Sequence, residues 1–252
     1  MRSLSRHFHV VLRMWRVDHI VVIGGGLAGC ECACRLARAG LQVTLFEQKP
    51  GRFSPAHSSE NLAELVCSNS LRSDELTSGV GLLKQEMREL GSLVMDAAEK
   101  TRVPAGKALA VDRELFSRLI SERIAAEENI TLLRREIAGL NDPALREASR
   151  VVVAAGPLAS DSLSASLSEL TGGQLYFYDA IAPIVLGDSV DMNIAFRGTR
   201  NADPKDQSPG DYLNCPMNKE EYLRFYEALC SARVTPTRDF EKECHFEACM
   251  PL

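Results

Sequence analysis

The first residues whose spacing suits chemistry are glycines that follow the pattern G-x-G-x-x-G. In this pattern the first glycine permits a tight turn, and the second lets backbone N–H groups approach a pyrophosphate. The third glycine permits close packing of a helix against a strand. We therefore expect this run to bind the pyrophosphate of a dinucleotide. Its residues are Gly24, Gly25, Gly26, Leu27, Ala28 and Gly29.

An acidic residue follows where such a site needs one. Glu47 stands 18 residues after Gly29, at the end of an apolar stretch of strand length. A carboxylate there can accept hydrogen bonds from the hydroxyls of an adenosine ribose, and it disfavours a 2′-phosphate by like-charge repulsion. FAD or NAD therefore fits better than NADP.

A second short motif favours FAD over NAD as the cofactor. Residues 151–157 read Val-Val-Val-Ala-Ala-Gly-Pro, an apolar strand ending in small residues. Two-domain flavoproteins carry a motif of this kind where the chain passes the flavin, so we predict that Ala155 and Gly156 contact the cofactor. Taken alone, a strand followed by Gly-Pro is also an ordinary turn.

Cysteine is the third candidate for chemistry. Cys67 lies in a polar, glycine-punctuated segment, where a partly exposed thiolate could be stabilised by backbone donors or nearby cations. With no base identified in the sequence, an ordinary cysteine is the alternative. Cys30, Cys32 and Cys34 alternate within a predicted helix, so we interpret them as small apolar residues in its packing. No C-x-x-C pair occurs, which argues against a zinc ribbon or a redox pair, and we expect no metal site.

The elements that must position these residues indicate an α/β domain. Strands are predicted at 19–23, 41–46, 130–133 and 151–153, and helices at 30–39 and 113–126. The order of strand, glycine turn, helix and strand at the start is a βαβ unit. We therefore predict a Rossmann-like domain with a parallel sheet.

Composition sets the class of protein and its compartment. The 252 residues are 45% apolar and 25% charged, with a net charge of −5, as in soluble globular proteins. This charge does not point to nucleic acid as a partner, and no apolar run approaches the roughly 18 residues of a membrane span. Eight cysteines without a disulfide-like pattern favour a reducing cytoplasm. Residues 1–17 are arginine-rich and free of acids; we prefer a disordered tail over a transit peptide.

Several runs together resemble one known family. They lie at 24–29, 55–57, 63–72, 103–106, 108–113, 175–180, 212–217 and 246–251. They closely resemble the folate- and FAD-dependent tRNA (uracil-5-)-methyltransferase family, TrmFO, formerly Gid, within the MnmG/TrmFO flavoprotein group. The similarity extends from about His19 to the last residue, and the segments around Cys67 and Cys215 are long enough to be specific.

The resemblance implies a function. Such an enzyme makes 5-methyluridine in the T-loop of tRNA, with 5,10-methylenetetrahydrofolate as one-carbon donor, FADH2 as reductant and NAD(P)H as the source of electrons. A thiolate that adds to C6 of uracil makes C5 nucleophilic. By motif the two cysteines implicated in the family fall on Cys67 and Cys249, and we favour Cys249 as the nucleophile and Cys67 as a thiol beside the flavin. The sequence itself does not decide between them.

The resemblance also implies a domain plan. Residues 1–17 form a tail, 18–157 an FAD-binding domain and 158–252 the start of an inserted α+β domain for substrate and tRNA. The family continues beyond the motif with Cys249, so we expect a C-terminal truncation, and we expect the isolated chain to bind FAD poorly and to be inactive. Scattered cations, among them Arg134 and Arg135, are expected to meet the T-arm of tRNA, and the oligomeric state is left open.

Two other functions remain as alternatives. One is a flavoprotein that places carboxymethylaminomethyl groups on wobble uridines of tRNA. That relative carries a Cys-Asn-Pro and Gly-Gly pattern where this chain has Cys67-Ser68-Asn69. The other is an inactive remnant that binds flavin or RNA.

Overall fold

The computed structural model describes residues 18–66, 68–172, 186–199 and 210–233, which fall into two compact units. The first unit comprises residues 1–66, 87–101 and 113–175, and the second comprises the rest of the chain. The predicted domain boundary lay at residue 157. In the structure the first unit continues to residue 175, because the helix that follows the last strand of its sheet packs into the same core.

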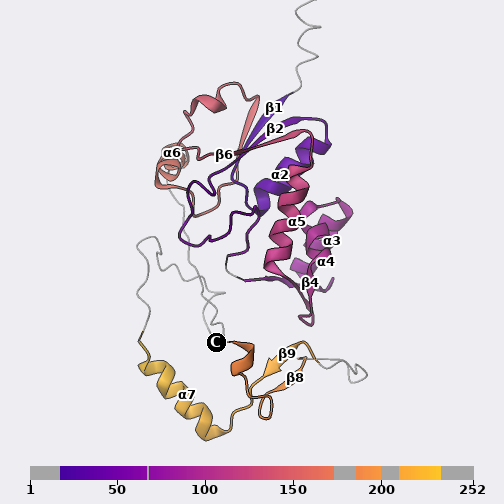
Figure 1. The fold of residues 1–252 in the computed structure, drawn as a ribbon, viewed down its shortest axis with the longest axis vertical. Coiled ribbons are helices and arrows are strands. Elements are labelled where there is room, and N and C mark those ends of the chain that lie inside the picture. Colours follow the sequence, from indigo (N-terminus) through magenta and orange to yellow (C-terminus); the bar gives the residue numbers. More distant parts are fainter. Residues whose placement is uncertain (1–17, 67, 173–185, 200–209, 234–252) are drawn as a thin grey trace, which may run out of the picture. The chain divides into compact units, whose positions relative to one another are not determined.

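The first unit is built on a four-stranded parallel sheet. Its strands are β1 (His19–Ile23), β2 (Gln42–Glu47), β6 (Ile130–Arg134) and β7 (Arg150–Val153), in the order β6-β2-β1-β7 (Figure 1). The apolar β-branched runs seen in the sequence form these strands because both faces of a parallel sheet are covered. The predicted Rossmann-like α/β fold is confirmed.

Helices cover both faces of this sheet (Figure 1). On one face lie α2 (Leu27–Arg38), α4 (Leu93–Lys100) and α5 (Arg113–Ala125), which contact one another. On the other face α6 (Asp161–Thr171) places Leu163 in a buried cluster. The rest of that cluster is Val21, Ile23, Phe46, Ile137 and Leu145, the last on the short 3-10 helix η1 (Pro143–Leu145).

The second unit contains antiparallel strands and one further helix. One sheet has the order β3-β5-β4, and the other pairs β8 with β9. Its helix α7 (Lys219–Ser231) and a 3-10 helix η2 (Gly187–Ser189) complete the described part, while α3 (Gly79–Glu89) runs from this unit into the first. The strands are β3 (Ser70–Ser73), β4 (Arg102–Val103), β5 (Ala108–Val111), β8 (Phe196–Gly198) and β9 (Tyr212–Asn214).

The helix α2 begins earlier than the sequence predicted. The prediction started at Cys30, whereas the first helical residue is Leu27, directly after the glycine turn. Cys30 and Cys34 are buried on its inner face and Cys32 is half-buried, which confirms that the first two serve packing. No helix within the described ranges is long and apolar enough to cross a membrane.

Candidate nucleotide-binding site

The turn after β1 brings the two predicted cofactor motifs together. Gly24 has φ +106°, and a Cβ there would lie 2.5 Å from the carbonyl oxygen of Ala154. The N–H of Gly24 donates to Phe46 O at 2.8 Å, and the N–H of Ala154 donates to Ile23 O at 2.7 Å. Only glycine fits this close approach and this left-handed backbone, so its predicted role in a tight turn is confirmed.

Gly29 allows α2 to approach that turn. A Cβ on Gly29 would lie 1.8 Å from the carbonyl oxygen of Gly24, a backbone atom that cannot move aside. A side chain at this position would therefore push the helix away from the turn. This is the close packing that the third glycine of the pattern was predicted to permit.

The N-terminus of α2 is left without a cap of its own. Its N-cap residue is Gly26, whose extended backbone (φ −74°, ψ −172°) suits a capping residue but offers no side chain to bond the first turn. The first turn contains no acidic residue, and a Cβ on Gly26 would meet nothing within 4 Å among the described residues. Uncapped N–H groups, the positive end of the helix dipole and open space together suit a bound phosphate.

Glu47 is fixed beside this helix terminus. It is 7% exposed, and its Oε2 accepts the N–H of Gly25 at 2.9 Å while its Oε1 accepts the N–H of Lys49 at 2.9 Å. Each carboxylate oxygen keeps further lone-pair capacity for a hydroxyl. The predicted ribose-binding acid is therefore oriented before any ligand arrives, and its negative charge opposes a 2′-phosphate.

The two predicted residues of the motif after β7 have different surroundings: one packs against the core and the other leaves room for a ligand. Ala155 is partly buried against the core cluster that contains Val21 and Leu163. Gly156 has φ +70°, and a Cβ there would meet nothing within 4 Å among the described residues. Gly156 can therefore approach a ligand closely, while the contact predicted for Ala155 remains a prediction.

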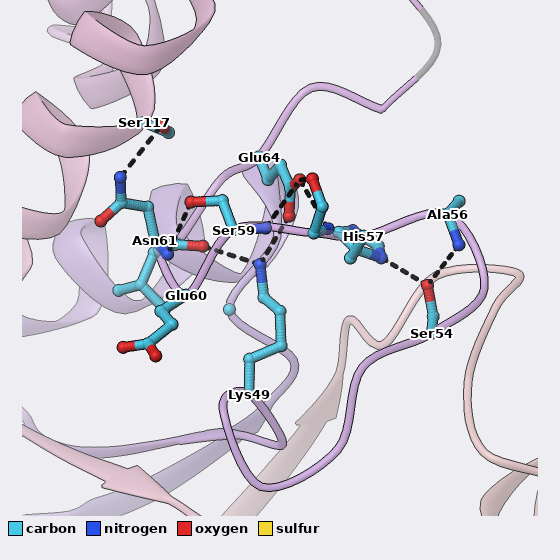
Figure 2. Close-up of polar contacts among 12 residues, drawn as sticks. Lys49, Ser54, Ala56, His57, Ser59, Glu60, Asn61, Glu64 and Ser117 are labelled. Carbon is cyan, nitrogen blue, oxygen red and sulfur yellow. Dashed lines mark hydrogen bonds and ion pairs between the residues drawn. The ribbon is translucent and has the colours of Figure 1, made fainter.

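A buried ion pair beside the glycine turn was not predicted from the sequence. The Nζ of Lys49 donates to the carbonyl oxygen of Asn61 at 2.7 Å and lies 3.1 Å from Oε2 of Glu64 (Figure 2). The two side chains are only 5% and 12% exposed. Nothing in local sequence periodicity links positions 49 and 64, since the connection runs through an irregular segment.

Glu64 also collects hydrogen bonds from the segment before it. Its Oε1 accepts the backbone N–H of Ser58 at 2.9 Å and of Ser59 at 3.1 Å, and the Ser58 hydroxyl at 3.2 Å. Burial alone would raise the pKa of Glu64, but hydrogen bonds from Ser58, Lys49 and Ser59 outweigh it and hold that pKa below its ordinary value. The carboxylate is therefore charged at neutral pH.

His57 lies in the same polar group (Figure 2). Its Nδ1 is within 2.5 Å of the Ser54 hydroxyl. Burial and the nearby Lys49 ammonium lower the pKa of His57, so the ring is neutral at pH 7. The Cys30 thiol beside the glycine turn is protonated at neutral pH, because burial raises its pKa to about 12, and its Sγ donates to Gly25 O at 3.3 Å.

The two arginines expected to meet tRNA have partners inside the first unit. Arg134 donates from Nη1 to the carbonyl oxygens of Lys49 at 3.2 Å and Glu60 at 2.9 Å. Arg135 pairs with Asp142 at 3.1 Å, and its guanidinium lies 5.1 Å from the centre of the Phe46 ring. Arg134 thus helps to fix the segment after β2, and its contact with tRNA remains a prediction.

The two predicted catalytic cysteines, Cys67 and Cys249, lie outside the described residues, as do the aromatic residues at 176–178. Around the described side chains, no group of three or more His, Cys, Asp or Glu residues is placed to hold a metal ion. The described part therefore contains the predicted nucleotide-binding residues and neither of the two predicted catalytic cysteines.

Comparison with known proteins gives one family and a set of close relatives. Residues 19–251 match the family model described as glucose inhibited division protein A. A protein of Nitratidesulfovibrio vulgaris strain DP4 is 66% identical over 239 residues, covering 95% of this chain and 49% of that protein. One of Oleidesulfovibrio alaskensis is 64% identical over 240 residues, covering 95% and 53%. Both are named methylenetetrahydrofolate--tRNA-(uracil-5-)-methyltransferase TrmFO, and the chain spans about half of their length.

Among solved structures, the GidA-related protein from Thermus thermophilus is 17% identical, with a TM-score of 0.38. The alignment covers 61% of this chain and 68% of that one. A TM-score this low adds nothing to what the sheet order already shows about the fold.

Proposed function

Since the chain belongs to the glucose inhibited division protein A family, we propose that it provides the flavin nucleotide site of an enzyme that methylates C5 of uridine in tRNA. The one-carbon donor is 5,10-methylenetetrahydrofolate. Support for this substrate comes from the names of relatives that are 66% and 64% identical over nearly the whole chain. Those names also favour uracil C5 over the wobble-uridine alternative.

The residues of the first unit fit FAD. The open, acid-free N-terminus of α2 at Gly26 suits the pyrophosphate, and Glu47 is oriented to accept the hydroxyls of the adenosine ribose. Gly156 leaves room for a ligand to approach the end of β7. FAD, when bound, supplies the reducing electrons of the reaction. The observation that carries this proposal is the uncapped terminus of α2 beside a pre-oriented acid.

Two cysteines are proposed to act on the substrate side. A thiolate adds to C6 of uracil, which makes C5 nucleophilic enough to attack a one-carbon electrophile. A base then removes the C5 proton as the bond between the methylene carbon and its carrier breaks, which leaves an exocyclic methylene at C5. Hydride addition to this methylene completes the methyl group and expels the thiolate from C6. By family motif we assign Cys249 as the nucleophile and Cys67 as a thiol beside the flavin.

Reductant and partners follow from the same proposal. NAD(P)H is proposed as the source of the electrons that reduce the flavin. The T-arm of tRNA is the macromolecular substrate, and the cytoplasm is the compartment.

The proposal is tested in a full-length enzyme, because relatives are about twice as long as this chain. In this enzyme, called the chimera below, residues 19–252 replace the matching half of the Nitratidesulfovibrio vulgaris protein. We expect it to transfer the one-carbon unit of labelled methylenetetrahydrofolate to C5 of uridine in the T-loop of a tRNA transcript. Transfer to a wobble uridine, or to none, would contradict the proposal.

Cysteine variants of the chimera test the mechanism. We expect Cys67→Ala and Cys249→Ala each to abolish methyl transfer. Cys32→Ala is the matched control, because Cys32 lies half-buried on α2 and burial raises the pKa of its thiol. If both Cys67→Ala and Cys249→Ala retained full activity, the assignment of the thiols would be wrong.

A further inference from the structure

The segment that follows β2 lies directly on the glycine turn. The N–H of Ala63 donates to Gly25 O at 2.8 Å. Leu62 packs so closely that its Cδ2 lies 2.5 Å from where a Cβ of Gly25 would stand. Residues 49–64, called the clamp segment below, therefore contact the backbone of the proposed pyrophosphate site.

The clamp segment is also bonded to α5 and β6. The Ser121 hydroxyl on α5 accepts the N–H of Leu62 at 2.9 Å. Arg134, at the end of β6, donates to the carbonyl oxygens of Lys49 and Glu60. Ala63 is held at φ +52°, a left-handed conformation that is uncommon for alanine and that persists where surrounding contacts fix it.

Lys49 connects the clamp segment to the acid of the nucleotide site. Its backbone N–H orients Glu47, while its ammonium binds Asn61 O and the carboxylate of Glu64. One residue thus contacts both the proposed ribose acceptor and the two points that hold the clamp segment in place. Figure 2 shows the contacts of its ammonium with Asn61 and Glu64.

The chemistry of this ion pair indicates that it fixes the geometry of the clamp segment rather than increasing the stability of the fold. A buried ion pair costs so much desolvation that an apolar pair of similar volume often stabilises a fold as well or better. An apolar pair cannot, however, accept the N–H groups of Ser58 and Ser59 or donate to Asn61 O. Those bonds set the path of residues 58–61, and only the charged pair provides them.

We propose that Lys49 and Glu64 are positioning residues for the flavin nucleotide, which hold the clamp segment against Gly25 and Glu47 in the shape that binds FAD. This inference rests on the proposed flavin site. It assigns the specificity of that site in part to a side-chain pair remote from the glycine pattern.

The test separates positioning from stability in the chimera. The variants are Lys49→Met, Glu64→Gln and the double Lys49→Met/Glu64→Leu, and the measurements are the melting temperature of the FAD-free protein and the Kd for FAD. Each single substitution leaves a buried charge without its opposite charge, so we expect a lower melting temperature and a Kd raised about tenfold or more. In the double variant the melting temperature returns towards the wild-type value, but the Kd for FAD stays raised.

A control pair shows what an ion pair outside the clamp segment does. Arg118 and Glu122 on α5 lie 3.9 Å apart and are 62% and 66% exposed. The double Arg118→Met/Glu122→Leu should leave the Kd for FAD unchanged. If the Kd of the Lys49/Glu64 double variant recovered together with its melting temperature, the pair would be structural only and the inference would be overturned.

Two further results keep the inference testable. Should the double variant not fold, amide exchange of the Ala63 N–H in the single variants decides: we expect it to be faster than in the FAD-free wild type, and an unchanged rate would overturn the inference. If the wild-type chimera itself bound no FAD, the proposed flavin site would fail, and the inference with it. That outcome is distinct from a wild type that binds FAD and variants that bind it equally well.

Discussion

Two helices of the molecule, α2 in the first unit and α7 in the second, begin in opposite ways. α7 has a capping box, in which Asn218 accepts the N–H of Glu221 and the Glu221 carboxylate accepts the N–H of Asn218. None of the residues of α7 is buried in the described structure. α2 buries an inner face that includes Cys30, Ala33 and Cys34, yet its N-cap is Gly26, with no side chain to bond the first turn.

The difference shows where a ligand is needed. In α7 the capping box satisfies the N–H groups of Asn218 and Glu221 with local side chains. In α2 tertiary packing stabilises the helix, and no described side chain caps the N–H groups of its first turn, which suits an anion. An uncapped helix end in a well-packed unit is therefore a functional signal, whereas a capped end in an exposed helix is a local structural one.

The largest effect is expected from closing the space between α2 and its turn. Gly29→Ala places a Cβ against Gly24 O, a backbone atom, so we expect a loss of about 3 kcal/mol or more in the free energy of unfolding. Denaturant unfolding of the chimera measures it. A variant as stable as the wild type would mean that α2 does not depend on this contact, and the contrast with α7 would weaken.

A smaller effect is expected when the cap of α7 is removed. Asn218→Ala deletes the acceptor for the Glu221 N–H, at a cost of about 1 kcal/mol to the first turn. Amide exchange at Glu221 should then be about fivefold faster. The Kd for FAD should not change, since α7 contributes none of the residues that we propose to bind the nucleotide; a weaker Kd would contradict the division of roles between the two helices.

The smallest effect concerns pH and the clamp segment. The pKa of His57 is lowered in the folded protein, so the native state binds fewer protons than the unfolded state below about pH 6.5. The contribution of His57 is therefore fully present above that pH and is lost as the pH falls towards its folded pKa. The slope stays below about 1.4 kcal/mol per pH unit.

His57→Gln tests this dependence. The free energy of unfolding between pH 7 and 5 should fall less steeply in the variant than in the wild type. The pKa of Glu64 is also lowered, and its contribution is lost only below its ordinary value of about 4.3, so Glu64 itself does not titrate between pH 7 and 5. Equal slopes for His57→Gln and the wild type would show that His57 does not titrate in this window.

Much of the nucleotide site could be predicted because the residues that define it lie close together in the sequence. The glycine pattern, the strand before it and Glu47 lie within one βαβ unit, and each position has a fixed physical task. The helix predicted at 113–126 likewise matches α5 to within one residue at its end. Periodicity and turn chemistry are sufficient for such elements.

The clamp segment was not predictable for the opposite reason. Lys49 forms an ion pair with Glu64 across an irregular segment, and the N–H of Leu62 donates to the hydroxyl of Ser121, 59 residues further along the chain. Such pairs form only where the chain folds back on itself, and the periodicity of the sequence does not indicate which residues then meet. From the sequence we expected Arg134 to contact tRNA, whereas in the structure its guanidinium donates to two backbone carbonyl oxygens.

The most direct test gives α2 the kind of cap that α7 has. In the chimera, Gly26→Asp places a carboxylate on an extended backbone suited to capping, where it should add about 0.5 kcal/mol of stability. The same carboxylate competes with the pyrophosphate for the N–H groups and for the positive end of the helix, so we predict a Kd for FAD raised about a hundredfold. A folded protein that loses its yellow colour on gel filtration would support the account; a variant that keeps one FAD per chain with wild-type affinity would contradict it.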